Sequence, residues 1–346
     1  MEIENLYTIT GPQSRRSSYV EALRVEFDVA RDISIDDISK NRINRKPILD
    51  YKARLLGNKA AAGGYSDWLD SFMIQYGPRE KCLSLGSGLG RVESYLIEKG
   101  FTSAIDAIEV CSEVNFSTRI NEKGVDFLPG DLNFSEISDN SYDFILCHGV
   151  LHHLINLELV LYRVNRALKP GGLLLIYEYI GEDRWQFKDE RMSILRQEFS
   201  GLRFTVPPIW SVAGFESVRS SELHPLVRKY FGSSCQREML YGGAYFPFIT
   251  CTEDRYDDLL PEVLRLDEAC VRDGRLEPCY MMGIYGKAPE LLVSARAWST
   301  DELDRRLAPR MPVTARARRL AKRTAIWRMA RAIKRRLARA INRRPG

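Results

Sequence analysis

The chain has 346 residues, with 51 lysines and arginines against 46 acidic residues, and its formal net charge is +5. The segment 316–346 holds 11 arginines, two lysines and no acidic residue, so it carries +13 and the remainder carries −8. A composition of 45% apolar and 28% charged residues excludes a disordered or fibrous protein. No apolar run reaches the roughly 20 residues of a membrane span, and the first five residues lack the order of a signal peptide.

The cysteines indicate the redox state that suits this chain. The chain has seven cysteines, which are widely spaced and form no Cys-x-x-Cys pair and no zinc-ligand pattern. An odd number of scattered thiols favours a reduced, cytosolic protein. We therefore expect neither a disulfide framework nor a bound metal.

The first elements along the chain are helical. Residues 1–62 are polar with scattered helical signals, which predicts an N-terminal helical extension that ends before Gly63-Gly64. A helix is expected to begin at Ser66-Asp67, because the apolar residues that follow recur at helical spacing. Gly77-Pro78 ends this helix.

Strands and helices then alternate up to residue 180. Short apolar runs predict strands at 81–85, 104–108, 125–128, 142–147 and 173–177. Helices are expected at 91–99, with Val92, Tyr95 and Leu96 facing inward, and at 157–168. Continuous apolar strands separated by helices predict a parallel sheet that is covered on both faces.

The pattern changes after residue 181. Helices are expected at 189–199, 220–230 and 259–270, and strand-like runs at 238–249 and 280–285 would add antiparallel strands at one sheet edge. The predicted fold is α/β, a Rossmann-like doubly wound and mostly parallel sheet with antiparallel edge strands. Residues 63–180 would form its cofactor-binding core, 181–289 would complete the fold and bind the acceptor, and 290–346 would be a linker and a basic tail.

A glycine-rich segment follows the first predicted strand. Gly86, Ser87, Gly88 and Gly90 stand between that strand and a helix, where glycines let the backbone approach a ligand and the helix offers free N–H groups. A tight strand-to-helix turn that binds no ligand can have the same glycine-rich sequence. The loop alone is therefore weak evidence for a nucleotide site.

Polar residues follow the other strands. Glu109 ends the second strand, where a carboxylate can accept hydrogen bonds from ribose hydroxyls or be an ordinary strand-end charge. Asp131 and Leu132 follow the third strand, where an acid and a backbone N–H can bind an adenine edge. His148 ends the fourth strand, and Lys169-Pro170-Gly171-Gly172 precedes the fifth.

This ordered set, over roughly 81–180, resembles the class I S-adenosylmethionine-dependent methyltransferases. The resemblance implies that the glycine loop wraps the methionine part of the cofactor, that Glu109 holds the ribose, and that Asp131 and Leu132 meet adenine. His148 would line the cofactor near the transferable methyl group. The chain departs from the family at Ser84, where most members have an acid that helps to hold the cofactor's amino group; a serine cannot supply that charge, but another acid could substitute.

A narrower resemblance extends to about residue 286. Glu178-Tyr179-Ile180-Gly181, the segment Glu216–Glu222 and Tyr241-Gly242-Gly243 are similar to a bacterial subgroup often found among glycan-assembly enzymes. This similarity implies a sugar or glycan-lipid acceptor by association. The polar residues expected to contact the acceptor, or alternatively to form surface ion pairs, are Arg184, Gln186, Arg219 and Glu222.

A hydroxyl acceptor requires a general base. The candidates are His152, His153 and Glu178, at the carboxyl ends of the fourth and fifth strands, where open α/β sheets bind ligands. A histidine titrates near neutral pH and can take the hydroxyl proton. A capping or packing role is the alternative for the histidine pair, and Glu178 could instead anchor the substrate or pair with Arg184.

The basic tail has the pattern of an amphipathic helix. Ile326, Ile333, Leu337 and Ile341 share one sector with Trp327 at its edge, and most of the arginines lie opposite. Such a helix is typical of a segment that lies on an anionic membrane surface. Packing on the body, a disordered solubilising tail, and unspecific binding to nucleic acid are the alternatives.

The sequence thus predicts a methyltransferase that uses S-adenosylmethionine to O-methylate a sugar or glycan precursor at the cytoplasmic face of the membrane. Methylation of a diffusible small metabolite is one alternative. An RNA methyltransferase that holds phosphates with its tail is another, which the acidic body disfavours. A cofactor-binding scaffold without activity is supported only by Ser84.

Overall fold

The structure is a computed structural model, which describes residues 19–20, 22–23, 46–55, 66–88, 90–110, 124–203, 214–249, 251, 255–289, 299 and 302. The basic tail at 316–346 and most of the predicted N-terminal extension lie outside these residues. No described helix is both long and apolar enough to cross a membrane.

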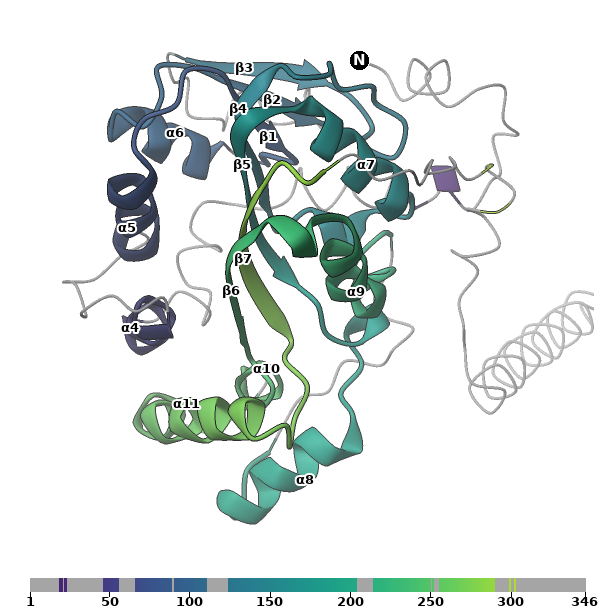
Figure 1. Cartoon of the computed structure of the whole chain (residues 1–346). Coiled ribbons are helices and arrows are strands. Elements are labelled where there is room, and N and C mark those ends of the chain that lie inside the picture. Colours follow the sequence, from purple (N-terminus) through teal and green to yellow (C-terminus); the bar gives the residue numbers. More distant parts are fainter. Residues whose placement is uncertain are drawn as a thin grey trace, which may run out of the picture. The chain divides into compact units, whose positions relative to one another are not determined.

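One sheet organises the described part of the chain (Figure 1). Its strands are β1 (Cys82–Leu85), β2 (Ile105–Glu109), β3 (Val125–Pro129), β4 (Tyr142–His148), β5 (Leu168–Tyr179), β6 (Cys235–Tyr241) and β7 (Tyr280–Gly286). Their order is β3-β2-β1-β4-β5-β7-β6. The first five strands pair in parallel, whereas β7 is antiparallel to both β5 and β6. The predicted Rossmann-like sheet with antiparallel edge strands is confirmed.

Helices cover both faces of this sheet. The helices are α4 (Lys46–Leu55), α5 (Ser66–Tyr76), α6 (Arg91–Glu98), α7 (Leu157–Ala167), α8 (Asp189–Glu198), α9 (Ser220–Phe231), α10 (Tyr245–Phe248) and α11 (Tyr256–Arg272), with short 3₁₀ turns η2 (Leu151–His153), η3 (Asp183–Trp185) and η5 (Gly232–Ser234). Figure 1 shows α5 and α6 on one side of the sheet and α7 and α9 on the other. The apolar strands are buried because both of their faces are covered.

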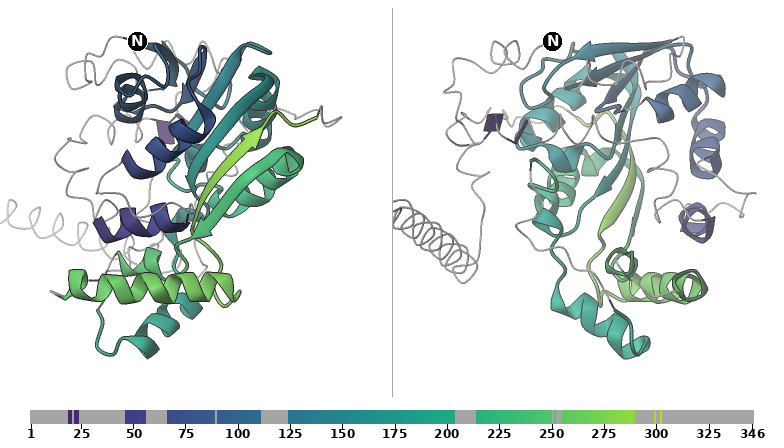
Figure 2. Two further views of the ribbon diagram at one scale, coloured as in Figure 1. Left: turned by 60° about the vertical axis from the view of Figure 1, so that its left-hand side comes forward. Right: turned by 180° about the vertical axis from the view of Figure 1, so that it is seen from behind.

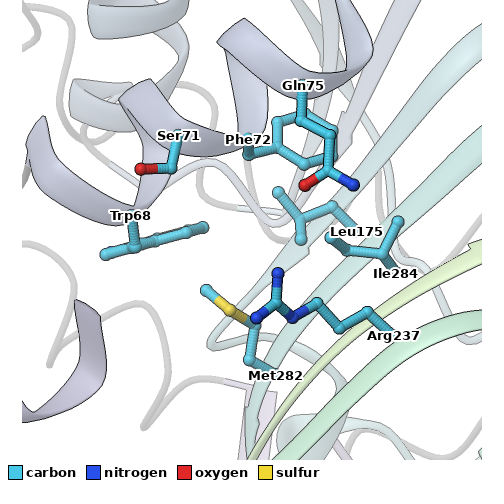
Figure 3. Close-up of a pocket in the computed structure, with 8 residues that line it drawn as sticks. All are labelled: Trp68, Ser71, Phe72, Gln75, Leu175, Arg237, Met282 and Ile284. Atoms are coloured by element: carbon cyan, nitrogen blue, oxygen red, sulfur yellow. The ribbon is translucent and has the colours of Figure 1, made fainter. Parts of the chain in front are cut away.

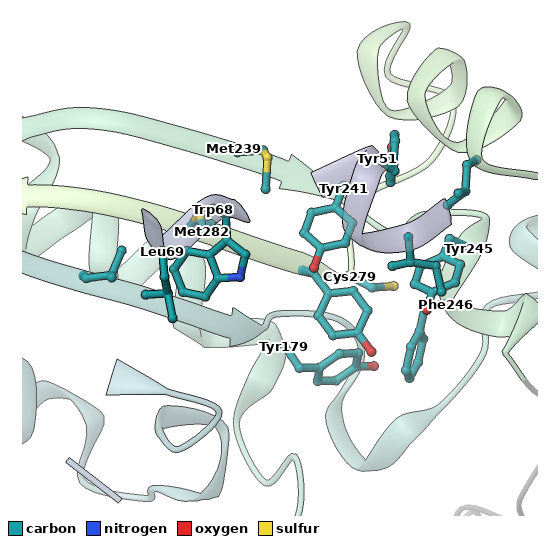
Figure 4. Packing of buried hydrophobic residues seen from close by; sticks show 14 of the residues in the cluster. Tyr51, Trp68, Leu69, Tyr179, Met239, Tyr241, Tyr245, Phe246, Cys279 and Met282 are labelled. Carbon is teal, nitrogen blue, oxygen red and sulfur yellow. The ribbon is translucent and has the colours of Figure 1, made fainter. Parts of the chain in front are cut away.

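Two hydrophobic cores correspond to the two faces. One contains Trp68 and Phe72 of α5, and aromatic side chains near the ends of β6 and β7 extend it, as Figure 4 shows for Tyr241 and Tyr245. The other contains the apolar sides of α7 and α9. Side chains on alternate positions of β5 enter different cores, for example Leu175 the first and Leu174 the second.

Helix α4 joins the first core through α11, beside which it lies in both views of Figure 2. Tyr51 donates a hydrogen bond to Asp267 at 2.8 Å, and Arg54 pairs with Glu268 at 2.6 Å. Helix α4 falls within the predicted N-terminal helical region, and these contacts attach it to the body.

The strand predicted at 238–249 is wrong beyond Tyr241. The chain turns at Gly242, whose φ is +91°, and residues 245–248 form α10. The buried carboxylate of Asp267 accepts hydrogen bonds from the backbone N–H groups of Gly242, Ala244 and Tyr245 at 2.7–2.9 Å. These bonds satisfy the backbone without a strand partner, so an apolar run becomes a turn and a short helix.

Two smaller predictions also need correction. Strand β5 begins at Leu168 instead of 173, because Leu168 pairs with Tyr142 before the ladder shifts register. In α6, Val92 and Tyr95 are only half-buried, whereas Glu93 and Ser94 are buried together with Leu96. The inward face of α6 is therefore partly polar.

Candidate functional site

The glycine loop after β1 has the backbone that its sequence predicts. Gly86, Gly88 and Gly90 all have positive φ, between +54° and +74°. A Cβ at Gly86 would stand 2.2 Å from a Val150 methyl group, whereas a Cβ at Gly88 would meet no atom within 4 Å. Gly86 is thus required by packing, and Gly88 exposes backbone to open space that a ligand can enter.

The strand-two acid lies against this loop. Glu109 is 8% exposed, and its Oε2 accepts a hydrogen bond from the N–H of Gly88 at 2.8 Å. The structure therefore brings together two parts of the site that the sequence predicted separately. A carboxylate held in this way is oriented at the edge where the parallel strands end.

Ser84, the residue that departs from the expected pattern, is paired with an acid from the next helix. Its hydroxyl donates a hydrogen bond to Oε1 of Glu93 at 2.5 Å, and the two side chains are 1% and 2% exposed. Burial raises the pKa of Glu93 to about 7, with nearby Glu109 adding to the increase and the bond from Ser84 opposing it. The carboxyl group of Glu93 consequently lies beside Ser84, the strand position where the resemblance leads us to expect an acid.

Asp131 is buried beneath a tyrosine from the N-terminal part of the chain. Oδ2 of Asp131 accepts a hydrogen bond from the Tyr19 hydroxyl at 2.5 Å, and Oδ1 accepts from the backbone of Asn133 at 3.0 Å. Burial raises the pKa of Asp131, and these bonds oppose the increase. Leu132 beside it is also buried. The predicted adenine-binding corner therefore includes residues near position 19.

His148 lies in a stack of aromatic rings. Its ring centroid is 4.9 Å from that of Tyr177 and 6.3 Å from that of Trp68, and the planes are nearly parallel. Burial lowers the pKa of His148 to about 4, with Lys52 adding to the decrease, although Glu178 opposes it. The imidazole is consequently neutral at physiological pH, which suits a residue that lines a pocket more than one that carries charge.

These residues fit a nucleoside cofactor with an amino-acid portion. Gly88 leaves the space for a close approach to the loop, and the Glu109 carboxylate stands beside it. Oε2 of Glu93 is buried without a hydrogen-bond partner among the described residues, so it can accept a donor from a ligand.

A second cluster forms where β4 and β5 end. Nδ1 of His152 lies 2.7 Å from Oε2 of Glu178, which is 1% exposed. The other oxygen of Glu178 accepts the backbone N–H groups of Val150 and Leu151, both at 2.7 Å. Both oxygens of Glu178 are therefore engaged, one by η2 and one by His152, so Glu178 is placed to orient the histidine. With Nδ1 donating to this carboxylate, the Nε2 atom of His152 is an acceptor.

Glu216 completes this cluster. Its two oxygens lie 3.5 Å from Nε2 of His152 and 3.6 Å from Nε2 of His153. The three side chains offer ligand atoms within 4.8 Å of one another, a set that could hold a metal ion. Arg184 supports the segment, because its Nη1 donates to the carbonyl of Glu216 at 3.2 Å and its backbone N–H donates to Ser217.

The remaining predicted acceptor contacts are placed differently. Arg219 is 2% exposed and is held by Glu158 and Glu222 at 2.6–2.7 Å. Gln186 is exposed and donates to the carbonyl of Asp183 at 2.7 Å. The structure thus brings Arg184 to the histidine cluster, whereas Arg219 and Glu222 are joined in an ion-pair network.

A pocket lies on the α5 side of the sheet, and one of its lining residues, Trp68, also stacks with His148. Figure 3 shows Trp68, Ser71 and Gln75 of α5 on one side and Arg237 and Met282 of the edge strands on the other. Its volume is about 290 Å³, including space open to solvent. None of the predicted site residues lines it.

Sequence reasoning missed Glu93, Tyr19 and the role of Glu216. The signal for Glu93 was an acid three residues after Gly90, on a helix that follows a strand without its usual acid. Glu216 lies in the segment Glu216–Glu222, whose sequence indicates only a resemblance to the glycan-assembly subgroup. Nothing in the local pattern linked Tyr19 to Asp131, which is 112 residues away.

Comparison with known proteins identifies similar domains over this part of the chain. A family profile described as "methyltransferase domain" matches residues 83–176, which include the glycine loop, Glu109, Asp131 and the histidine pair. Phosphoethanolamine N-methyltransferase 2 of Caenorhabditis elegans is 24% identical over 243 residues, covering 64% of this chain and 54% of that protein. Sterol 24-C-methyltransferase erg6 of Schizosaccharomyces pombe is 27% identical over 112 residues, covering 31% of this chain and 29% of that protein. The chain spans about half the length of the first relative and less than a third of the second.

Solved structures include similar chains. Haemonchus contortus phosphoethanolamine N-methyltransferase 2, in complex with phosphomonomethylethanolamine and S-adenosylhomocysteine, has a TM-score of 0.39 and 14% identity, over 75% of this chain and 61% of that one. Burkholderia thailandensis 1,6-didemethyltoxoflavin-N1-methyltransferase has a TM-score of 0.40 and 16% identity, over 81% of this chain and 93% of that one. The family match thus shows that residues 83–176 are similar to a methyltransferase domain.

Proposed function

We propose that this chain O-methylates a hydroxyl group of a sugar or glycan precursor, with His152 as the general base. The observation that carries the proposal is the 2.7 Å contact between His152 Nδ1 and the buried carboxylate of Glu178. It lies at the carboxyl ends of the parallel strands, where open α/β sheets bind ligands.

The chemistry requires a positioned acceptor and a place for one proton. S-adenosylmethionine supplies an electrophilic methyl group on its sulfonium sulfur. Glu178 fixes the ring orientation and the tautomer of His152, so that Nε2 can accept the proton that the acceptor hydroxyl loses. The imidazolium formed is stabilised by Glu178 on one side and Glu216 on the other. The glycine loop, Glu109 and Asp131 would hold the cofactor.

The acceptor class rests on a resemblance and has a competitor. The segments beginning at Glu178, Glu216 and Tyr241 are similar to a glycan-assembly subgroup. An amine acceptor is the second candidate, because the relative with 24% identity over 243 residues is a phosphoethanolamine N-methyltransferase. The same base would serve it, since an alkylammonium must lose a proton before it can accept a methyl group.

The place of action would be the inner face of the cell membrane. The support is the +13 charge of residues 316–346 and the apolar sector with Trp327, a composition that binds anionic lipid surfaces. Full-length protein should co-sediment with vesicles that contain anionic lipid at low salt, and less of it at high salt. A chain lacking 316–346 should remain in the supernatant, and co-sedimentation of that shortened chain would assign the binding elsewhere.

The function is tested with methyl-labelled S-adenosylmethionine and three acceptor fractions: lipid-linked glycans, free nucleotide sugars, and phosphoethanolamine. Label should enter a glycan or sugar fraction, and His152→Ala should abolish this transfer while it still binds S-adenosylhomocysteine. His224→Ala is the matched control, because His224 of α9 pairs with Glu238 of β6 and its loss should not alter transfer. Label found only in phosphoethanolamine would establish the amine acceptor instead.

A further inference from the structure

A buried carboxylate oxygen beside the glycine loop lacks a partner. Glu93 stands in the first turn of α6, directly after the loop, and is 2% exposed. Oε1 accepts the Ser84 hydroxyl at 2.5 Å, but Oε2 has no hydrogen-bond partner among the described residues. An unsatisfied buried carboxylate oxygen costs stability, so its retention requires a reason.

The surroundings of Glu93 favour a cation. Glu109, the second carboxylate of the loop region, is close enough to disfavour the charge on Glu93. The N–H of Gly88 already binds Glu109, and a side chain at Gly88 would meet only open space. A positively charged ligand group near these two carboxylates would stabilise the charge on both.

We propose that Glu93, oriented by Ser84, binds the α-ammonium group of the cofactor's methionine portion. The proposal rests on S-adenosylmethionine being the cofactor, and it assigns a residue that the family resemblance does not. The acid expected on β1 is replaced by a serine, and the carboxylate is delivered from α6 instead. Ser84 keeps a role, because its hydroxyl fixes one oxygen of Glu93 and leaves the other for the ligand.

The test compares two ligands that differ in the amino-acid portion, which carries the α-ammonium group together with a carboxylate. S-adenosylhomocysteine carries the amino-acid portion, whereas 5′-methylthioadenosine keeps the nucleoside and the thioether but lacks the ammonium. Their dissociation constants are measured by titration calorimetry for the full chain and for three variants: Glu93→Gln, Ser84→Asp with Glu93→Gln, and Glu98→Gln. Glu98 is the matched control, since it is an exposed glutamate on the same helix.

Glu93→Gln should weaken S-adenosylhomocysteine binding by about 10- to 100-fold, the usual range for one charged hydrogen bond. Binding of 5′-methylthioadenosine should change by less than about twofold, which also shows that the variant is folded. The added Ser84→Asp should restore most of the affinity, and Glu98→Gln should have no effect.

An equal loss for both ligands, or no loss for either, would overturn the role of Glu93 while leaving the cofactor assignment intact. Failure of the wild-type chain to bind either ligand would overturn the cofactor assignment together with this inference.

Discussion

Glu178 orients the imidazole of His152, because its Oε2 lies 2.7 Å from Nδ1 of the ring. Its Oε1 accepts hydrogen bonds from the backbone N–H groups of Val150 and Leu151, both at 2.7 Å. The strand β5 thereby positions a side chain that follows β4. This relationship explains why a glutamate is buried at the end of β5, because each of its oxygens has a donor.

Replacement of Glu178 by glutamine should change the protonation of His152 without changing the binding of the cofactor. An amide would place an N–H₂ group against Nδ1 of His152, so Nε2 would carry the proton and could no longer accept one. We expect kcat to fall by about 10²- to 10⁴-fold, the usual worth of a general base. The affinity for S-adenosylhomocysteine, measured by calorimetry, should stay within about twofold. Unchanged kcat in Glu178→Gln would remove His152 as the base.

The stability of the cofactor-free protein should depend on pH through Glu93. Burial raises its pKa from the ordinary 4.5 to about 7. Between these values the folded state keeps a proton that the unfolded chain releases, so the free energy of unfolding decreases as pH rises from 4.5 to 7. The full penalty, on the order of 3 kcal/mol, is present above pH 7.

Urea unfolding at pH 5 and pH 8 measures this effect. Glu93→Gln should be as stable as the wild type at pH 5 and more stable at pH 8, because the amide has no charge to bury. Glu98→Gln, exposed on the same helix, should follow the wild-type profile. If Glu93→Gln loses as much stability as the wild type between the two pH values, the titration belongs to another group.

The sheet could be predicted because its information is local. Each parallel strand is a short apolar run between turn signals, and the glycine loop and Glu109 are identified by their position after a strand. The turn and short helix at 242–249 could not be predicted, because they depend on three long-range hydrogen bonds to Asp267 of α11. Likewise, the sequence does not reveal the ion pair of Arg219, because its partner Glu158 is 61 residues away. Arg219 was therefore predicted to contact the acceptor.

The role of Arg219 can be tested by stability. Its guanidinium is buried and makes paired contacts with Glu158 and a third with Glu222. Arg219→Ala would leave Glu158 without its cation and should lower the free energy of unfolding by about 3 kcal/mol. Arg219→Lys should recover little of this loss, because an ammonium group cannot reproduce the planar fork. A raised acceptor KM with unchanged stability would instead support a direct acceptor contact.

The histidine cluster makes a prediction about metal ions. Oε1 of Glu216 lies 3.5 Å from Nε2 of His152, and Oε2 lies 3.6 Å from Nε2 of His153. Zn²⁺ could bridge two such nitrogens and one of these oxygens with bonds of about 2 Å. A metal on Nε2 of His152 would occupy the lone pair that accepts the proton. We expect enzyme dialysed against a chelator to keep its activity, and micromolar Zn²⁺ to inhibit it reversibly.

His153→Ala identifies the origin of that inhibition. This variant removes one ligand of the three but leaves Nε2 of His152 and its partner Glu178 in place, so its activity should persist and its sensitivity to Zn²⁺ should fall by about 10-fold or more. Initial rates over a Zn²⁺ series, with metal content measured by mass spectrometry, decide the matter. If the chelator abolishes activity and Zn²⁺ restores it, the cluster is a catalytic metal centre, and the role of His152 is coordination instead of proton transfer.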